Sequence, residues 1–154
     1  MLRNLVLLAV AGLGSVWHEQ ASAQGTAMFP FDSVKTFRCD FSESEGRRTS
    51  AEGVTTPAKR ETFSDLVIDN IDYQKRSARF IGNAGSETVA VIAGDKVVSF
   101  IEITLSGNVN LLSIFKDTAE LNLYKAAFSR HLALMTGDLI ISQSYGTCRA
   151  LLLP

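Results

Sequence analysis

Two cysteines carry the chemistry that this sequence predicts most directly. Cys39 and Cys148 are the only cysteines among its 154 residues. An even number of cysteines in an exported chain is typical of a disulfide, and without a C-x-x-C pair a catalytic thiol is not expected. We therefore expect a Cys39–Cys148 disulfide. It would close a loop of about 110 residues and stabilise the fold by roughly 4.7 kcal/mol in the chain-entropy model.

Histidine is scarce, and this limits metal and acid–base chemistry. The chain has two histidines, and His18 lies in an N-terminal segment that we expect to be removed, which leaves His131 alone. One histidine cannot supply a histidine-rich zinc site or a two-histidine iron site. The sequence also lacks the G-x-S-x-G, H-E-x-x-H, G-x-G-x-x-G and phosphate-loop motifs. We expect no enzyme activity, no metal and no cofactor.

Arg130 is a candidate binding residue. It shares strand parity with Tyr124, Phe128 and Leu132, so a regular strand would point it toward the apolar side. We hypothesise that it is tethered to a carboxylate near one mouth of a barrel. The alternative is that a bulge or a helix places Arg130 in solvent. His131 alternates with Arg130 and should face outward.

Arg47 and Arg48 are weaker candidates. They form a small basic cluster in a polar stretch, and Lys59 and Arg60 form a second one. Glutamates are interspersed with both clusters, so only a faint preference for a membrane surface or a polyanion is indicated.

The N-terminal residues 1–23 are typical of a secretory signal. Arg3 precedes a run of about twelve largely apolar residues, and Ala21-Ser22-Ala23 is a small-x-small cleavage site. The run is shorter than the roughly 20 residues of a membrane-spanning helix. We expect cleavage near Ala23 and a periplasmic or secreted protein. The alternative is an uncleaved N-terminal anchor.

Composition excludes two further classes of protein. The net charge is −1, with 20% charged and 46% hydrophobic residues. A nucleic-acid-binding protein needs excess positive charge to displace counterions from phosphates. A disordered chain has fewer apolar residues than this one.

The rest of the sequence predicts short strands and little helix. Residues 24–33 show no period and are expected to be a lead-in, and residues 42–61 are polar and predict a long loop. Alternation of apolar and polar side chains predicts a first strand over 34–41. Seven more strands are expected, over 63–71, 76–81, 87–93, 96–105, 109–115, 121–135 and 139–148. Segment 121–135 also has some helical spacing, but we favour a strand.

Eight strands with short links predict an all-β fold, an antiparallel up-and-down barrel formed by one domain over 34–154. Barrel closure would place the first strand beside the last and so bring Cys39 to Cys148. The interior is expected to contain two sets of side chains: Phe37, Cys39 and Phe41, and Ile101, Ile103 and Leu105. An eight-stranded barrel is either filled by side chains or holds one small ligand. We favour a filled interior.

The organisation resembles small exported bacterial β-barrels, including lipocalin-like proteins and periplasmic lysozyme inhibitors. The likeness is carried by residues 1–23, by Arg38-Cys39-Asp40 at the start of the domain and by Tyr145-Gly146-Thr147-Cys148 at its end. Residues 100–112 are similar to strands of exported proteobacterial proteins without an assigned activity. The Ser-Gly-x-x-Tyr element of the lysozyme inhibitors and the Gly-x-Trp of lipocalins are absent.

These observations predict a non-catalytic exported binding or interaction module. The expected partner is another exported or cell-envelope protein, bound through residues 42–61 or a barrel mouth. The main alternative is a lipocalin-like carrier of a small apolar ligand. An enzyme and an outer-membrane barrel are further alternatives, although the chain lacks a terminal aromatic residue. We expect no nucleic-acid partner and no stable membrane insertion of the mature chain.

Overall fold

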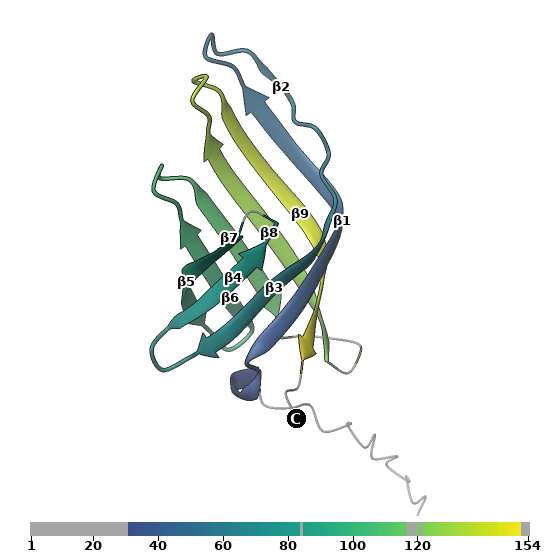
Figure 1. Ribbon diagram of the computed structural model, residues 1–154. Helices are drawn as coiled ribbons and strands as arrows, with labels where there is room; N and C mark the ends of the chain where they lie inside the picture. Colours follow the sequence, from purple (N-terminus) through teal and green to yellow (C-terminus); the bar gives the residue numbers. More distant parts are fainter. Residues whose placement is uncertain (1–30, 84, 117–119, 121, 152–154) are drawn as a thin grey trace, which may run out of the picture.

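A computed structural model describes residues 31–83, 85–116, 120 and 122–151 of the chain (Figure 1). The predicted signal at 1–23 and most of the predicted lead-in lie outside these residues. The elements are η1 (Phe31–Ser33), β1 (Thr36–Thr49), β2 (Thr55–Pro57), β3 (Phe63–Asp72), β4 (Ser77–Gly82), β5 (Gly85–Ala93), β6 (Val97–Ile103), β7 (Val109–Phe115), β8 (Leu123–Ala133) and β9 (Leu139–Leu151).

Eight of the strands form a closed antiparallel barrel, which confirms the predicted fold class. Each strand from β3 to β8 pairs with the next one in the chain, and β1 pairs with both β3 and β9. Segment 121–135, which was ambiguous in the sequence, contains strand β8 and no helix among its described residues. Closure leaves few unpaired backbone groups along the barrel wall.

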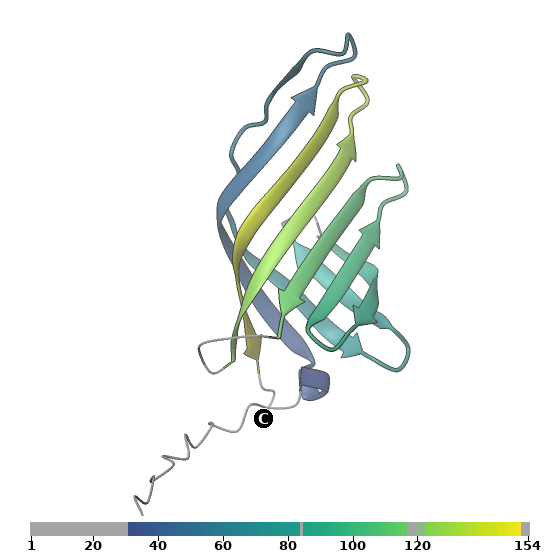
Figure 2. The same ribbon diagram turned by 180° about the vertical axis from the view of Figure 1, so that it is seen from behind.

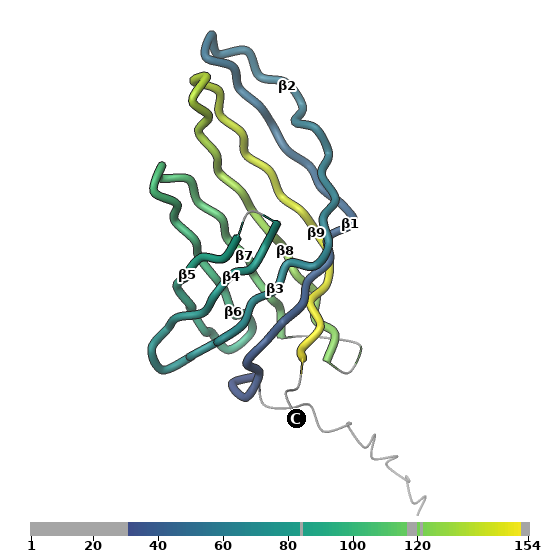
Figure 3. Tube along the Cα trace, in the orientation of Figure 1, coloured from purple at the N-terminus to yellow at the C-terminus, as the bar shows by residue number. Residues whose placement is uncertain are grey.

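The barrel walls are unequal in height. Strands β1, β8 and β9 extend well past β6 and β7 at one end (Figure 2). The turns β1–β2, β6–β7 and β8–β9 all lie at this end, and η1 lies at the other (Figure 3). We call the two ends the open end and the η1 end.

The prediction of a loop over residues 42–61 is wrong for 42–49 and 55–57. Residues 42–49 continue β1, where Glu43 to Thr49 pair with β9, and β2 pairs with the end of β1. These strands are polar because both of their faces meet water, so they lack the alternation that reveals a half-buried strand. Only the turn at 50–54 and the segment 58–62 lie outside strands.

Two features let β1 pass close to β9. The register shifts between Phe41 and Glu43, which is a β-bulge. Gly146 lies opposite Phe41, and a Cβ at this glycine would lie 2.8 Å from the Phe41 Cα. Only a residue without a side chain fits at this crossing.

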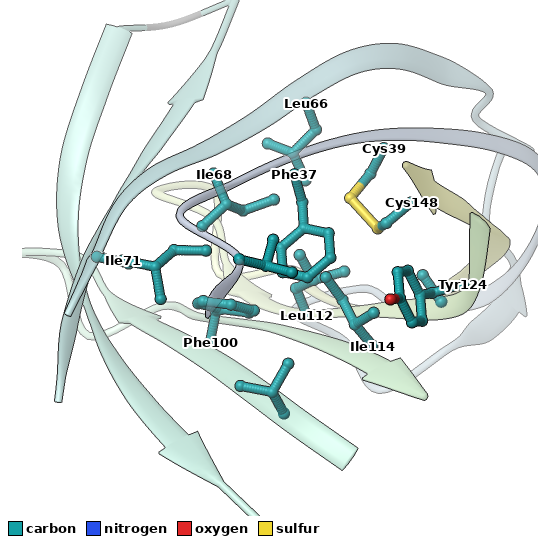
Figure 4. Packing of buried hydrophobic residues seen from close by; sticks show 14 of the residues in the cluster. Phe37, Cys39, Leu66, Ile68, Ile71, Phe100, Leu112, Ile114, Tyr124 and Cys148 are labelled. Atoms are coloured by element: carbon teal, nitrogen blue, oxygen red, sulfur yellow. A yellow bond between two sulfur atoms is a disulfide. The ribbon is translucent and has the colours of Figure 1, made fainter. Parts of the chain in front are cut away.

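The η1 half of the barrel is filled. Phe37, Phe100, Leu112 and Ile114 are fully buried there (Figure 4). Phe31 of η1 packs against Phe37 with ring centroids 5.4 Å apart. The predicted inward positions Phe37, Cys39 and Phe41 are confirmed, because all three are buried. Thus η1 closes this end of the barrel with an aromatic ring.

The predicted inward face of the 96–105 strand is wrong. Val98 and Phe100 face the core, whereas Ile103 and Leu105 are exposed and Ile101 is half-buried. Strand β6 carries apolar residues at both parities, so alternation does not identify its inner face. The pairing of β6 with β7 decides it, since Val98 lies opposite Ile114 and Phe100 lies opposite Leu112. Both of these β7 residues are fully buried.

The predicted disulfide is confirmed. Cys39 and Cys148 are bonded, lie directly opposite each other on β1 and β9 and have Cα atoms 4.0 Å apart. Both cysteines are fully buried beside Tyr124 (Figure 4). The bond therefore joins the first and last barrel strands at the seam that closes the barrel.

Candidate functional site

The open half of the barrel contains a pocket of about 1200 Å³. Its wall is formed by segment 58–62, by strands β3 to β8 and by turns between these strands. The filled half of the barrel lies below it. The interior is therefore neither wholly filled nor wholly hollow. Side chains fill the η1 half, and the other half is open to solvent.

Aromatic side chains form the floor of this pocket. Phe63, Phe80 and Phe128 line it, and Phe41 packs beneath them. The ring centroids of Phe63 and Phe128 are 5.3 Å apart, and those of Phe41 and Phe63 are 4.7 Å apart. These distances are typical of favourable aromatic pairs. Leu66 completes this apolar floor, whose side chains present little surface to the pocket, since Phe80, Phe128 and Leu66 are only 5%, 7% and 9% exposed.

A row of polar side chains lies above the floor on the inner wall. In strand register, Glu102 of β6 lies opposite Asn110 of β7, and Asn110 lies opposite Arg130 of β8. The Asn110 side-chain amide donates a hydrogen bond to Glu102 Oε2. The Asn110 Oδ1 atom is buried and has no hydrogen-bond partner among the described residues.

Arg130 faces the pocket and is tethered to a carboxylate, as hypothesised. Its Nη1 atom donates to Glu61 Oε2 at 3.0 Å. Glu61 belongs to segment 58–62, and its backbone N–H donates to Ser44 Oγ at 2.6 Å. The Ala58 N–H donates to the Gly46 carbonyl at 2.9 Å, which holds the other end of this segment against β1. Segment 58–62 is thus held against β1, and from there the Glu61 carboxylate reaches Arg130 of β8.

The other predicted binding residues lie outside the pocket. Arg48 donates from Nε to Asp138 Oδ2 at 3.0 Å, so it joins the β1–β2 hairpin to the β8–β9 turn. Hydrogen bonds from Arg48, helped by its positive charge, lower the pKa of the Asp138 carboxyl. Arg47 is exposed on β1, and His131 is exposed on β8 as expected. The structure does not bring Arg47 or Arg48 together with Arg130.

The sequence interpretation missed most of the pocket. Phe63, Phe80, Glu61 and Asn110 were not singled out, because they lie on four separate segments whose neighbours depend on barrel register. One signal was present for Glu102, since it shares parity with Phe100 and Val98, which are buried.

The charges of the pocket are balanced. Its lining includes the basic residues Lys59, Arg60 and Arg130 and the acidic residues Glu61, Glu87 and Glu102. Within the described part of the chain, no cluster of three or more His, Cys, Asp or Glu side chains is arranged to hold a metal ion. No helix in that part is both long and apolar enough to cross a bilayer. The arrangement suits a molecule with an apolar body and a polar end.

Comparison of the chain with protein-family models, curated proteins and solved structures found no match. The resemblance noted in the sequence is supported only in its coarse form, an eight-stranded antiparallel barrel with a disulfide.

Proposed function

We propose that this protein is a non-catalytic binding module that takes up a small amphipathic molecule through its open end. The observation that carries the proposal is the aromatic floor of Phe63, Phe80 and Phe128 beneath a pocket of about 1200 Å³. This proposal corresponds to the main alternative drawn from the sequence, a carrier of a small apolar ligand.

Water in contact with an apolar floor favours the entry of an apolar group. Burial of apolar surface contributes about 25 cal/mol per Å², and small-ligand pockets are usually concave, mostly apolar and roughly 300–1,000 Å³ in volume. The present pocket is somewhat larger than this range, and it combines the apolar floor with a polar wall. A ligand would lay its apolar body on the floor and keep its polar end at the mouth.

A neutral apolar fluorophore tests this proposal. We expect N-phenyl-1-naphthylamine to bind the purified chain saturably and with enhanced fluorescence. The variant Phe63→Gln should weaken binding about tenfold, because one buried aromatic ring contributes about 1.5–3 kcal/mol. Phe115→Gln is the matched control, since Phe115 is 39% exposed and does not line the pocket. Absence of saturable binding, or equal loss in both variants, would overturn the proposal.

A second candidate function is the binding of another exported or cell-envelope protein. It is favoured by Leu105 and Met135, two fully exposed side chains at the tips of the β6–β7 and β8–β9 turns, of which Leu105 also lines the pocket and Met135 does not. We expect the double variant Leu105→Ser, Met135→Ser to lose a partner captured from cell-envelope extract. Ile92→Ser is the control, because Ile92 is also exposed but lies on β5 outside the pocket lining. Equal capture by all three proteins would remove the tips as a binding surface.

Export is part of the proposal. A buried disulfide fits an oxidising compartment, where disulfides form and persist. We expect the protein isolated from the periplasm or the medium to begin near Gln24. Mass spectrometry of its N-terminus measures this, and recovery of the chain from the cytoplasm with Met1 or Leu2 at its N-terminus would contradict export.

A further inference from the structure

We infer that the polar end of the ligand is a carboxylate, that Arg130 binds it, and that Glu61 occupies the same place when the pocket is empty. This inference rests on the proposed function and adds the chemical class of the ligand. It follows from the position of Arg130, from its present partner and from the neighbouring charges.

Arg130 lies at a suitable distance from the aromatic floor. It is two residues after Phe128 on β8, and both side chains line the pocket. Two residues along a strand span about 7 Å. A molecule with its apolar chain on Phe128 would therefore place its polar end beside the guanidinium.

The present partner of Arg130 shows which group fits there. Glu61 Oε2 lies 3.0 Å from Arg130 Nη1, so the site already accommodates a carboxylate. The Glu61 side chain is 56% exposed and that of Arg130 is 33% exposed. Ion pairs this open to solvent are weak, whereas Arg can also bind a carboxylate through two parallel hydrogen bonds. A ligand that also buries an apolar chain can therefore displace Glu61.

The carboxylate in the polar row on β6 to β8 does not occupy the site. Glu102 accepts a hydrogen bond from Asn110, which lies between it and Arg130 in strand register. Asn110 thus holds the Glu102 carboxylate on the side of Asn110 that is away from Arg130. Lys59 and Arg60 directly precede Glu61 in the same segment, and they leave positive charge at the mouth once Glu61 is displaced.

The experiment compares dodecanoate with dodecan-1-ol, which has the same chain and a neutral end. Each compound is titrated against N-phenyl-1-naphthylamine bound to the purified full chain, at concentrations below the critical micelle concentration of dodecanoate. We expect dodecanoate to bind the unchanged protein at least about tenfold more tightly than the alcohol, as expected for hydrogen bonds to charged groups.

Arg130→Gln should remove this preference and leave the affinity for the alcohol within about twofold. Glu61→Gln should raise the affinity for dodecanoate by up to about fivefold, because it removes a competing exposed ion pair. Arg149→Gln is the charge-matched control, since Arg149 is exposed on β9 away from the pocket. Circular dichroism checks folding, and if Arg130→Gln is misfolded, the Glu61→Gln result decides.

The outcomes separate this inference from the proposed function. If acid and alcohol bind equally well, or if Glu61→Gln and Arg130→Gln change neither affinity, the inference is overturned while the binding module stands. If neither the fluorophore nor either amphiphile binds, the proposed function itself fails.

Discussion

Along the inner face of β8 the side chains change from Tyr124 to Phe128 to Arg130, and their surroundings change with them. Tyr124 is buried in the filled half, Phe128 belongs to the pocket floor and Arg130 faces the mouth. The same strand face thus belongs to the core at one end and to the pocket wall at the other. The change takes place within seven residues.

Substitutions of Tyr124 test whether the stability of the filled half comes from apolar packing alone. Its ring packs edge-on against Phe31 and Phe37, with centroids 5.2 and 5.8 Å away. Its hydroxyl is buried without a hydrogen-bond partner among the described residues, and burial raises the pKa of this phenol.

We expect Tyr124→Phe to be neutral or slightly stabilising, because a buried donor without a partner carries an unrecovered desolvation cost. Tyr124→Ala should lower the free energy of unfolding by about 3–5 kcal/mol, since it removes the ring and leaves a cavity. Urea denaturation measures both changes. A loss above about 1.5 kcal/mol in Tyr124→Phe would show that the hydroxyl is hydrogen-bonded.

At the scale of elements, the β1–β2 hairpin is joined to the β8–β9 turn through Asp138. This residue is 7% exposed and accepts hydrogen bonds from Arg48 and from the Ala51 backbone N–H. These donors compensate for the burial of the carboxylate. The β1–β2 hairpin and the β8–β9 turn are thereby held together at the open end of the barrel.

The Asp138 contact predicts a loss of stability in acid. The pKa of Asp138 is lowered in the fold, so the folded state binds fewer protons than the unfolded chain. This contribution is complete above the unfolded pKa of about 3.9 and disappears as the pH falls through the lower folded pKa. Between pH 7 and pH 3, Asp138→Asn should therefore lose less thermal stability than the unchanged protein.

Asp95→Asn controls for the removal of one charge, because Asp95 is exposed in the β5–β6 turn. The contact between Asp69 and Arg79, which also lowers the pKa of Asp69, remains in all three proteins. Equal acid sensitivity of the unchanged protein and Asp138→Asn would contradict the prediction.

At the scale of the whole molecule, closure depends on the seam between β1 and β9. These strands lie at opposite ends of the described chain, and thirteen residue pairs from Thr36–Leu151 to Thr49–Leu139 join them in register. The disulfide lies within this seam, with 109 residues separating its cysteines in sequence. A covalent link there favours the closed barrel, because it restricts the unfolded chain.

Removal of the disulfide should therefore destabilise the barrel without changing its pocket. We expect the double variant Cys39→Ala, Cys148→Ala to lose about 2–5 kcal/mol of unfolding free energy in urea. Its affinity for N-phenyl-1-naphthylamine should remain within about twofold, because neither cysteine lines the pocket. An unchanged urea midpoint would show that the strand pairing alone fixes the seam.

The sequence by itself determined the all-β class, the disulfide and the inward face of Phe37, because alternation at period two is a local signal. For Arg130 it left two positions open, the apolar side of a strand and solvent. It did not determine the inner face of β6, where apolar residues occupy both parities. It also did not reveal the polar strands at 42–49 and 55–57, whose pairing depends on distant partners.

Only the tertiary structure decided that the barrel is half filled and half open. The floor takes Phe63, Phe80 and Phe128 from three strands, and the carboxylate that meets Arg130 is 69 residues away in sequence. Which of these residues become neighbours depends on the register and closure of the whole sheet. No local pattern encodes the pocket, because it forms only where long and short strands meet at one end of the barrel.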